Sequence, residues 1–189
     1  TYRHFDVLGS YAHLTFQTEA FKKYTPDGLA LINKYDDMVK KQQEFMGLHK
    51  HGKGFNNRMY FLVVYDPEAY MYATTYFTGY NIGTQSSILD VDKLSTNTVW
   101  GPAHEVGHMN QTTPGLKWHG MTEVTNNIMS LHIQTSWGNK SRMIVENTYS
   151  AAIAEIINGK IAHNASTDVF NKLTPFWQLK LYMIDAQGK

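Results

Sequence analysis

Two histidines separated by three residues are the most informative feature of this 189-residue sequence. His104 and His108 enclose a glutamate in the pattern H-E-x-x-H, within the segment WGPAHEVGHMNQ. If the segment is helical, the two imidazoles lie one turn apart on one face and can meet a single Zn²⁺ ion. Glu105 lies about 100° around such a helix from His104. It would therefore flank a water held by the metal, which is where a general base is needed.

A second segment, WHGMTEVTNNIMSL, supplies a third candidate ligand. Its Glu123 follows His108 after fourteen residues. Pro114 and Gly115 interrupt the first helix, and a second helix can begin near Thr122. A helix–turn–helix arrangement can then return Glu123 to the histidine pair. Because catalytic zinc takes three protein ligands and leaves a fourth position for water, we expect one Zn²⁺ per chain.

Asn127 is expected to orient one of the two histidines. It follows Glu123 by four residues and therefore shares its helix face. Its side-chain oxygen can accept the free ring N–H and so fix the tautomer. The alternative is a partly buried helix with two hydrogen-bonded histidines and a solvated Glu123 at a helix start. The two segments taken together favour metal ligation.

Composition excludes several classes of protein. Charged residues make up 17% and hydrophobic residues 42%, which indicates a folded chain. The net charge is +1 without a basic or acidic run, so we expect neither a nucleic-acid nor an anionic-membrane partner. The absence of cysteine excludes iron–sulfur clusters, thiolate zinc sites and cysteine proteases. No stretch approaches the ~20 apolar residues of a membrane span, and we expect no membrane insertion in this segment.

The elements that must position these residues follow from the sequence pattern. We expect a helix over 26–46, with Thr25 as its N-cap. The β-rich runs predict one strand over 11–16, one over 59–65, and two or three short strands within 70–80. Helical spacing then predicts four helices: 98–111, 120–136, 141–158 and 167–186.

Strands followed by helices indicate an α+β fold rather than a parallel α/β fold. We expect one catalytic domain over residues 1–189, with an α/β lobe over 1–97 and a helical lobe over 98–189. The chain begins at Thr1 and ends at Lys189, which we interpret as a piece of a longer protein from which any targeting segment has been removed.

The two segments around the histidines and Glu123 resemble the enhancin and enhancin-like zinc metallopeptidases, peptidase family sixty, of the gluzincin type. The likeness extends to MYATTYFTGY, KSR and FWQL, and covers roughly residues 5–186. It implies a zincin-like fold with a small N-terminal mixed sheet plus helix, a mainly helical C-terminal part and an active-site helix bearing H-E-x-x-H. It also implies that His104, His108 and Glu123 bind zinc and that Glu105 is the catalytic base.

The resemblance implies a substrate class and a setting. Members of the family act on glycoproteins, including mucins, and several cleave beside an O-glycosylated serine or threonine. We therefore expect a zinc-dependent endopeptidase, secreted or at the surface of a host-associated microbe, with carbohydrate-binding domains elsewhere in the parent chain. Three alternatives stay open: a zinc peptidase without a glycan requirement, a non-catalytic zinc-stabilised glycoprotein-binding module, and a helical scaffold with accidental histidines.

Two places are predicted to contact substrate. An exposed sheet edge over 76–80 can add the peptide as a further strand, with Gly79 permitting close approach beside Tyr80. Trp118 can stack on a sugar ring or form a wall of the cleft. The alternative for Trp118, and for Trp100, is packing in the core beside the helix pair.

A further donor to the oxyanion of the reaction is expected from a histidine or tyrosine. The candidates are Tyr149, His119, His132 and His163. His132 follows Glu123 by nine residues and is expected to face away from the metal. Tyr149 has core packing as its alternative.

Overall fold

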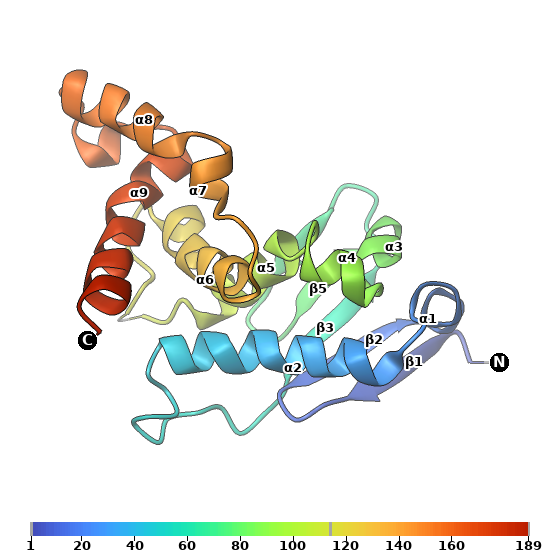
Figure 1. Ribbon diagram of the computed structural model, residues 1–189. Helices are drawn as coiled ribbons and strands as arrows, with labels where there is room; N and C mark the ends of the chain where they lie inside the picture. The colour runs from blue at the N-terminus through green and yellow to red at the C-terminus, as the bar shows by residue number, and fades with distance from the viewer. Residues whose placement is uncertain (1, 114, 189) are drawn as a thin grey trace.

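The computed structural model describes residues 2–113 and 115–188, and this part of the chain contains a five-stranded sheet (Figure 1). Its order is β1-β2-β3-β5-β4. The strands are β1 (His4–Leu8), β2 (Ala12–Gln17), β3 (Met59–Val64), β4 (Met71–Ala73) and β5 (Thr78–Asn81). The central pairs β2–β3 and β3–β5 are parallel, and the outer pairs β1–β2 and β4–β5 are antiparallel. The predicted small mixed sheet is confirmed.

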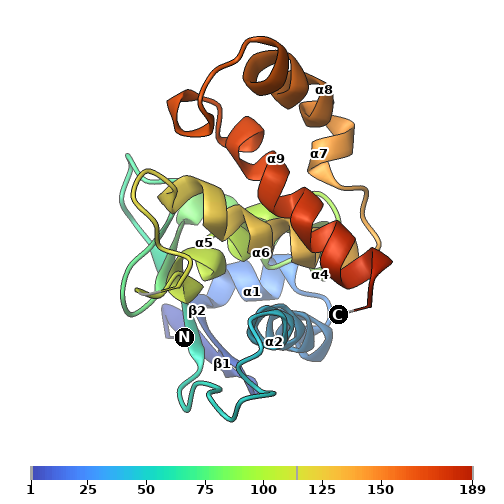
Figure 2. The ribbon, with the colours of Figure 1, turned by 90° about the vertical axis from the view of Figure 1, so that its left-hand side faces the viewer.

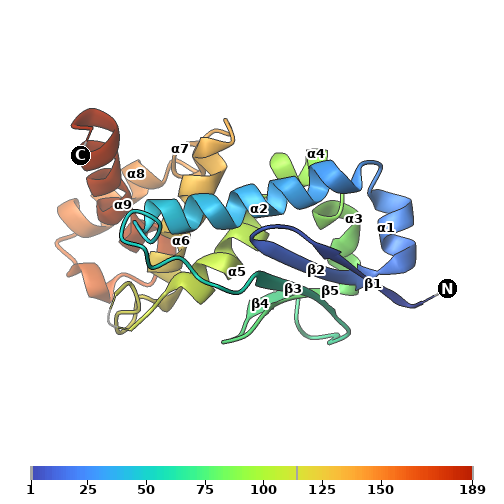
Figure 3. The ribbon, with the colours of Figure 1, turned by 90° about the horizontal axis from the view of Figure 1, so that it is seen from below.

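The sheet is covered on one face by the long helix α2 (Gly28–Phe45), as Figure 3 shows. Strands β2 and β3 alternate buried and half-buried residues because successive side chains point to opposite faces. Phe16 and Phe61 are fully buried and pack in one cluster with Tyr35 of α2. The predicted N-cap was wrong by two residues: the carboxylate of Asp27, rather than Thr25, accepts from the backbone N–H of Ala30.

Several short helices in the first half of the chain were not predicted from the sequence. They are α1 (Thr18–Tyr24), η1 (Ile82–Thr84), α3 (Gln85–Ile88) and α4 (Val91–Ser95). Each is too short to show the apolar periodicity by which longer helices are recognised. They complete the N-terminal layer and lead the chain from the sheet to the next long helix.

The second half of the chain is helical, as predicted. Its elements are α5 (Trp100–Asn110), α6 (Thr122–Ser136), α7 (Arg142–Val145), α8 (Thr148–Ala152), η2 (Ile153–Asn158), η3 (His163–Ala165), α9 (Val169–Lys180) and η4 (Leu181–Ala186). The single helix predicted over 141–158 is interrupted, because Asn147 adopts a left-handed backbone with φ of 54°. Among the described residues no helix combines the length and apolarity needed to cross a membrane.

Two apolar clusters hold these layers together. The first lies between the sheet and α2 and reaches Val106 and Ile133. The second joins α6 to α9 through buried Leu131, Leu173 and Trp177. Figure 2 shows α9 crossing α6, with α8 above α9. Helix α6 contributes to both clusters and packs along α5, so its position relative to α5 and to the sheet is fixed.

Candidate metal centre

A glycine lets the two helices of the site approach closely. A Cβ atom on Gly107 would lie 2.6 Å from the backbone oxygen of Asn126 in α6. No side chain could be placed there without moving one helix. Glycine inside a helix costs about 1 kcal/mol relative to alanine. Here that cost permits direct contact of the α5 and α6 backbones.

Three candidate ligand atoms converge where the helices meet. The Nε2 atoms of His104 and His108 are 3.1 Å apart, and Glu123 Oε2 lies 3.3 Å from each of them. Ligands about 2.1 Å from a tetrahedral metal ion stand about 3.4 Å apart, so these spacings suit one ion. The predicted helix–turn–helix return of Glu123 is present. Pro114, predicted to help end the first helix, lies outside the described residues.

Asn127 fixes the tautomer of His104. The Asn127 amide nitrogen donates to the Glu123 backbone oxygen at 2.7 Å, which turns its Oδ1 towards the ring. That oxygen lies 2.7 Å from His104 Nδ1, which must carry the ring proton. The Nε2 lone pair is then free to face the site. The structure therefore contains the contact expected from the four-residue spacing.

Gln111 does the same for His108, a role that was not predicted from the sequence. The Gln111 amide nitrogen donates to the Thr122 backbone oxygen and to Thr125 Oγ1, each at 2.7 Å. Its Oε1 must then face His108 Nδ1, 2.9 Å away, and accept the ring proton. Gln111 is only 7% exposed, so packing also restricts the orientation of its side-chain amide. The available signal was its position three residues after His108.

The chemistry of this donor set fits a metal ion. Both Nε2 atoms present lone pairs, and Glu123 adds a carboxylate, so three acceptors face one another within 3.3 Å. Acceptors crowded this closely repel one another unless a cation or an N–H donor lies among them. The amide nitrogen of Asn126 lies 3.0 Å from His108 Nε2 and 3.2 Å from His104 Nε2. Its buried Oδ1 has no hydrogen-bond partner.

The titratable groups have environments that suit this role. Burial lowers the pKa of His104, which keeps the ring neutral at pH 7. Glu105 is 6% exposed, and burial, with a smaller effect from the charge of Glu123, raises its pKa to about 7. A carboxyl group with a pKa near neutrality can both accept and return a proton.

Beside these residues lies an open cleft of about 570 Å³. One wall is the segment 71–75, which comprises β4 and the turn after it. The opposite wall holds Glu105 and the three candidate ligands, and Lys117 and Thr122 also line the cleft. Helix α5 packs directly against β4. The cleft therefore runs between the candidate ligands and a strand.

That strand, rather than the stretch predicted, is the edge of the sheet on the side of the cleft, and β1 is the opposite edge. The prediction of an edge over 76–80 was wrong, because β5 is paired on both sides, with β3 and with β4. Tyr80 is fully buried. A Cβ on Gly79 would lie 2.7 Å from the ring of Tyr72, which covers it. The free edge that faces the cleft is Met71–Ala73.

Trp118 and Tyr149, which were also predicted to contact substrate, do not line the cleft in the described part of the chain. Trp118 is 44% exposed and its ring packs 5.4 Å from that of Phe176. Trp100 is half-buried, and Arg142 covers its ring. Tyr149 is half-buried against the second apolar cluster.

The candidate oxyanion donors are not brought to the cleft. Within the described part of the chain, its lining includes neither Tyr149 nor any of the three histidines proposed. His132 stacks on Phe45 at 4.5 Å, away from the ligands as expected. His163 Nε2 lies 2.8 Å from the Lys172 backbone oxygen, and His119 is exposed.

A sequence profile of the family described as peptidase M60, enhancin and enhancin-like, matches residues 6–186. The chain belongs to this family. The resemblance noted in the sequence is thereby confirmed. A search of curated proteins finds no match.

Solved structures share the M60 fold of this chain. A functionally unknown conserved protein from Bacillus anthracis str. Ames is 36% identical over 94% of this chain, with a TM-score of 0.84. A metallopeptidase in complex with Tn antigen is 28% identical over 100%, with a TM-score of 0.84. The M60 catalytic domain of Clostridium perfringens ZmpC, in complex with the sialyl T antigen, is 25% identical over 95%, with a TM-score of 0.72.

These comparisons confirm the predicted α+β metallopeptidase fold. The chain spans 37%, 36% and 36% of the three solved chains, or just over one third of their length.

Proposed function

We propose that this chain carries the zinc centre of an M60 endopeptidase that hydrolyses peptide bonds in glycoproteins. The observation that supports it most is the set of three ligand atoms within 3.3 Å of one another, beside a buried glutamate in an open cleft. His104, His108 and Glu123 would hold the ion. Zinc bound there supplies Lewis-acid chemistry, since it acidifies a water and polarises a carbonyl group.

Glu105 acts as the general base. Its carboxylate takes a proton from the attacking water and returns that proton to the departing amine. The side chain follows His104 directly on α5 and lines the cleft, so it reaches the same space as the ligands. Asn127 and Gln111 hold the two imidazoles so that both Nε2 atoms face that space.

The substrate peptide lies along β4. This strand is paired with β5 on one side only and forms a wall of the cleft. A peptide added as a further strand would gain main-chain hydrogen bonds and would pass in front of Glu105. Thr74 and Thr75, which follow β4 and line the same wall, extend this path.

Glycoproteins, and mucin-type O-glycosylated segments in particular, are the proposed substrates. Two M60 structures similar to this chain are complexes with the Tn antigen and the sialyl T antigen. A third contains an M60 catalytic domain together with two CBM51 domains. We accordingly place the parent protein outside the cell or at its surface, with carbohydrate-binding domains elsewhere in its chain.

The test pairs a metal assay with cleavage by one variant. We expect the wild type to hold one zinc per chain and to cleave an O-glycosylated mucin peptide in preference to its unglycosylated twin. Glu105→Gln should keep the zinc and lower kcat by about 10²–10⁴-fold. Equal cleavage of both peptides would support a peptidase without a glycan requirement, and cleavage by Glu105→Gln at the wild-type rate would exclude the mechanism.

A further inference from the structure

A second pocket of about 200 Å³ adjoins the catalytic cleft. Thr75 and Met109 line both spaces, so a substrate that leaves the cleft along the β4 wall reaches this pocket next. The other lining residues come from α2, from the loop after it and from the start of β3: Gln43, Phe55, Asn57, Arg58 and Met59.

The pocket contains a buried amide with unused donors. Gln43 is 2% exposed, and its Oε1 lies 2.8 Å from His49 Nε2. With the oxygen facing the histidine, its amino group has no hydrogen-bond partner among the described residues. This amino group is not sealed from solvent, so it can donate to a ligand or a water that enters the pocket.

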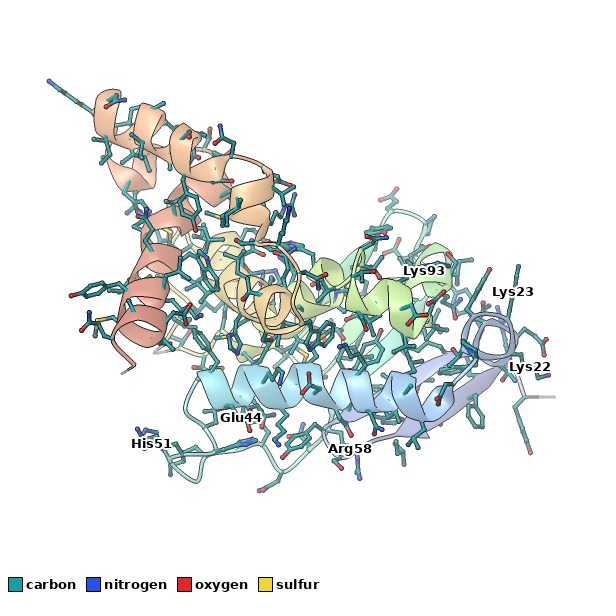
Figure 4. All side chains as sticks on the ribbon, in the orientation of Figure 1. Lys22, Lys23, Glu44, His51, Arg58 and Lys93 are labelled. Carbon is teal, nitrogen blue, oxygen red and sulfur yellow. The ribbon has the colours of Figure 1, made fainter. Side chains whose placement is uncertain are left out.

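Arg58 adds a cation to the same pocket. Its Nε donates to the backbone oxygen of Gly9, which anchors the guanidinium. Within the described part of the chain it forms no ion pair with a carboxylate, so its terminal nitrogens keep their donors. Figure 4 labels Arg58 below α2, and His51 in the loop that follows this helix.

The segment between Glu44 and Asp66 carries a net positive charge. Residues 45–65 include Lys50, Lys53 and Arg58 and contain neither aspartate nor glutamate. The adjoining cleft holds a further cation, Lys117, together with the carboxyl groups of Glu105 and Glu123. A pocket rich in N–H donors, with this charge around it, favours an anionic acceptor group.

We infer that this pocket is a subsite that binds a carboxylate group of the substrate, held by Arg58 and the amide of Gln43. The inference rests on the proposed peptidase function, because it assumes a substrate lying along β4. Two substrates carry such a group: a peptide with an aspartate or glutamate near the cleaved bond, and a glycopeptide with an acidic sugar. Charge-assisted hydrogen bonds from a guanidinium suit either of them.

The experiment compares twin substrates that differ only in this carboxylate. One pair is an O-glycopeptide with and without a terminal sialic acid. The other pairs exchange glutamate for glutamine at each position within three residues of the cleaved bond. For at least one pair, we expect the wild type to show a kcat/KM about tenfold higher for the acidic twin at low salt. The pair that responds identifies the source of the carboxylate.

Arg58→Gln should abolish this preference, so that the ratio of kcat/KM between the acidic and the neutral twin falls to about one. Lys53→Gln is the matched control, because it removes the same charge from the same loop at a residue that does not line the pocket. It should alter the preference by no more than about twofold. Arg58→Lys keeps the charge and should retain part of the preference.

Binding separates this inference from the proposed function. Fluorescence anisotropy with chelator-treated protein compares the affinities of the two twins without any cleavage. A tighter acidic twin in the wild type but not in Arg58→Gln would support the subsite even if no peptide were hydrolysed. Equal affinity for both twins, or an equal loss for both in Arg58→Gln, would overturn the inference.

Discussion

The hydrogen bond from His108 to Gln111 is open to a direct test by Gln111→Leu. The substitution keeps the approximate volume and removes the acceptor that fixes the His108 proton on Nδ1. Without that acceptor the ring can carry its proton on Nε2 instead, where no metal can bind. We therefore expect weaker zinc binding although every ligand remains.

The magnitude follows from the contacts that are lost. Gln111 is 7% exposed and makes three hydrogen bonds, to His108, to the Thr122 backbone oxygen and to Thr125 Oγ1. Each buried group left without a partner costs about 1–3 kcal/mol. Loss of a group that orients a metal ligand weakens metal binding about 10–100-fold, and we expect the zinc Kd of Gln111→Leu to rise by this factor.

The assay is competition for zinc with a chromophoric chelator, with urea unfolding of the metal-free protein measured in parallel. Gln85→Leu is the matched control, because Gln85 is 2% exposed and donates to Gln17 far from the site. Both variants should lose comparable stability, and only Gln111→Leu should lose zinc affinity. A zinc Kd within about twofold of the wild type for Gln111→Leu would refute the tautomer argument.

Three further results are expected. Gly107→Ala should destabilise the protein by about 1–3 kcal/mol in urea unfolding, because its methyl group would strike the Asn126 backbone; Gly101→Ala, which meets only the movable end of a methionine side chain, should cost less. Burial lowers the pKa of His132 to about 4, so the contribution of this residue to the free energy of unfolding should be full above pH 6.5 and fall by up to about 3 kcal/mol towards pH 4; the difference between the wild type and His132→Gln in pH-resolved melts should show this contribution. Chelation should lower Tm without unfolding the protein at 25 °C, as calorimetry with and without EDTA would show.

The sequence predicted the features that depend on local spacing. The i, i+4 spacing places His104 beside His108 in α5 and Glu123 beside Asn127 in α6, because both segments are regular helices. Gln111 obeys the same rule at i+3 and could have been found from the sequence. The sequence evidence for this role of Gln111 was weaker, because a glutamine three residues after a histidine can make many other hydrogen bonds.

Strand order could not be predicted in this way. The aromatic, threonine-rich stretch 70–80 was expected to present 76–80 as an edge, yet β5 inserts between β3 and β4. Which of two neighbouring short strands becomes the edge depends on the path of the chain between them, not on the composition of either strand. The burial of Tyr80 shows that β5 is an inner strand, since the Tyr80 side chain belongs to the first apolar cluster.

The direct contact of α5 and α6 at Gly107 bears on how the protein acquires its metal. Zinc fingers fold only when the ion binds, so folding and metal loading are one event. Here the two helices are pinned by backbone contact and by apolar clusters to which the candidate ligands do not belong. Loading should therefore behave as a simple ligand-exchange equilibrium on a finished scaffold. Cobalt could then replace zinc in the native protein and report by its visible spectrum on the ligands around it.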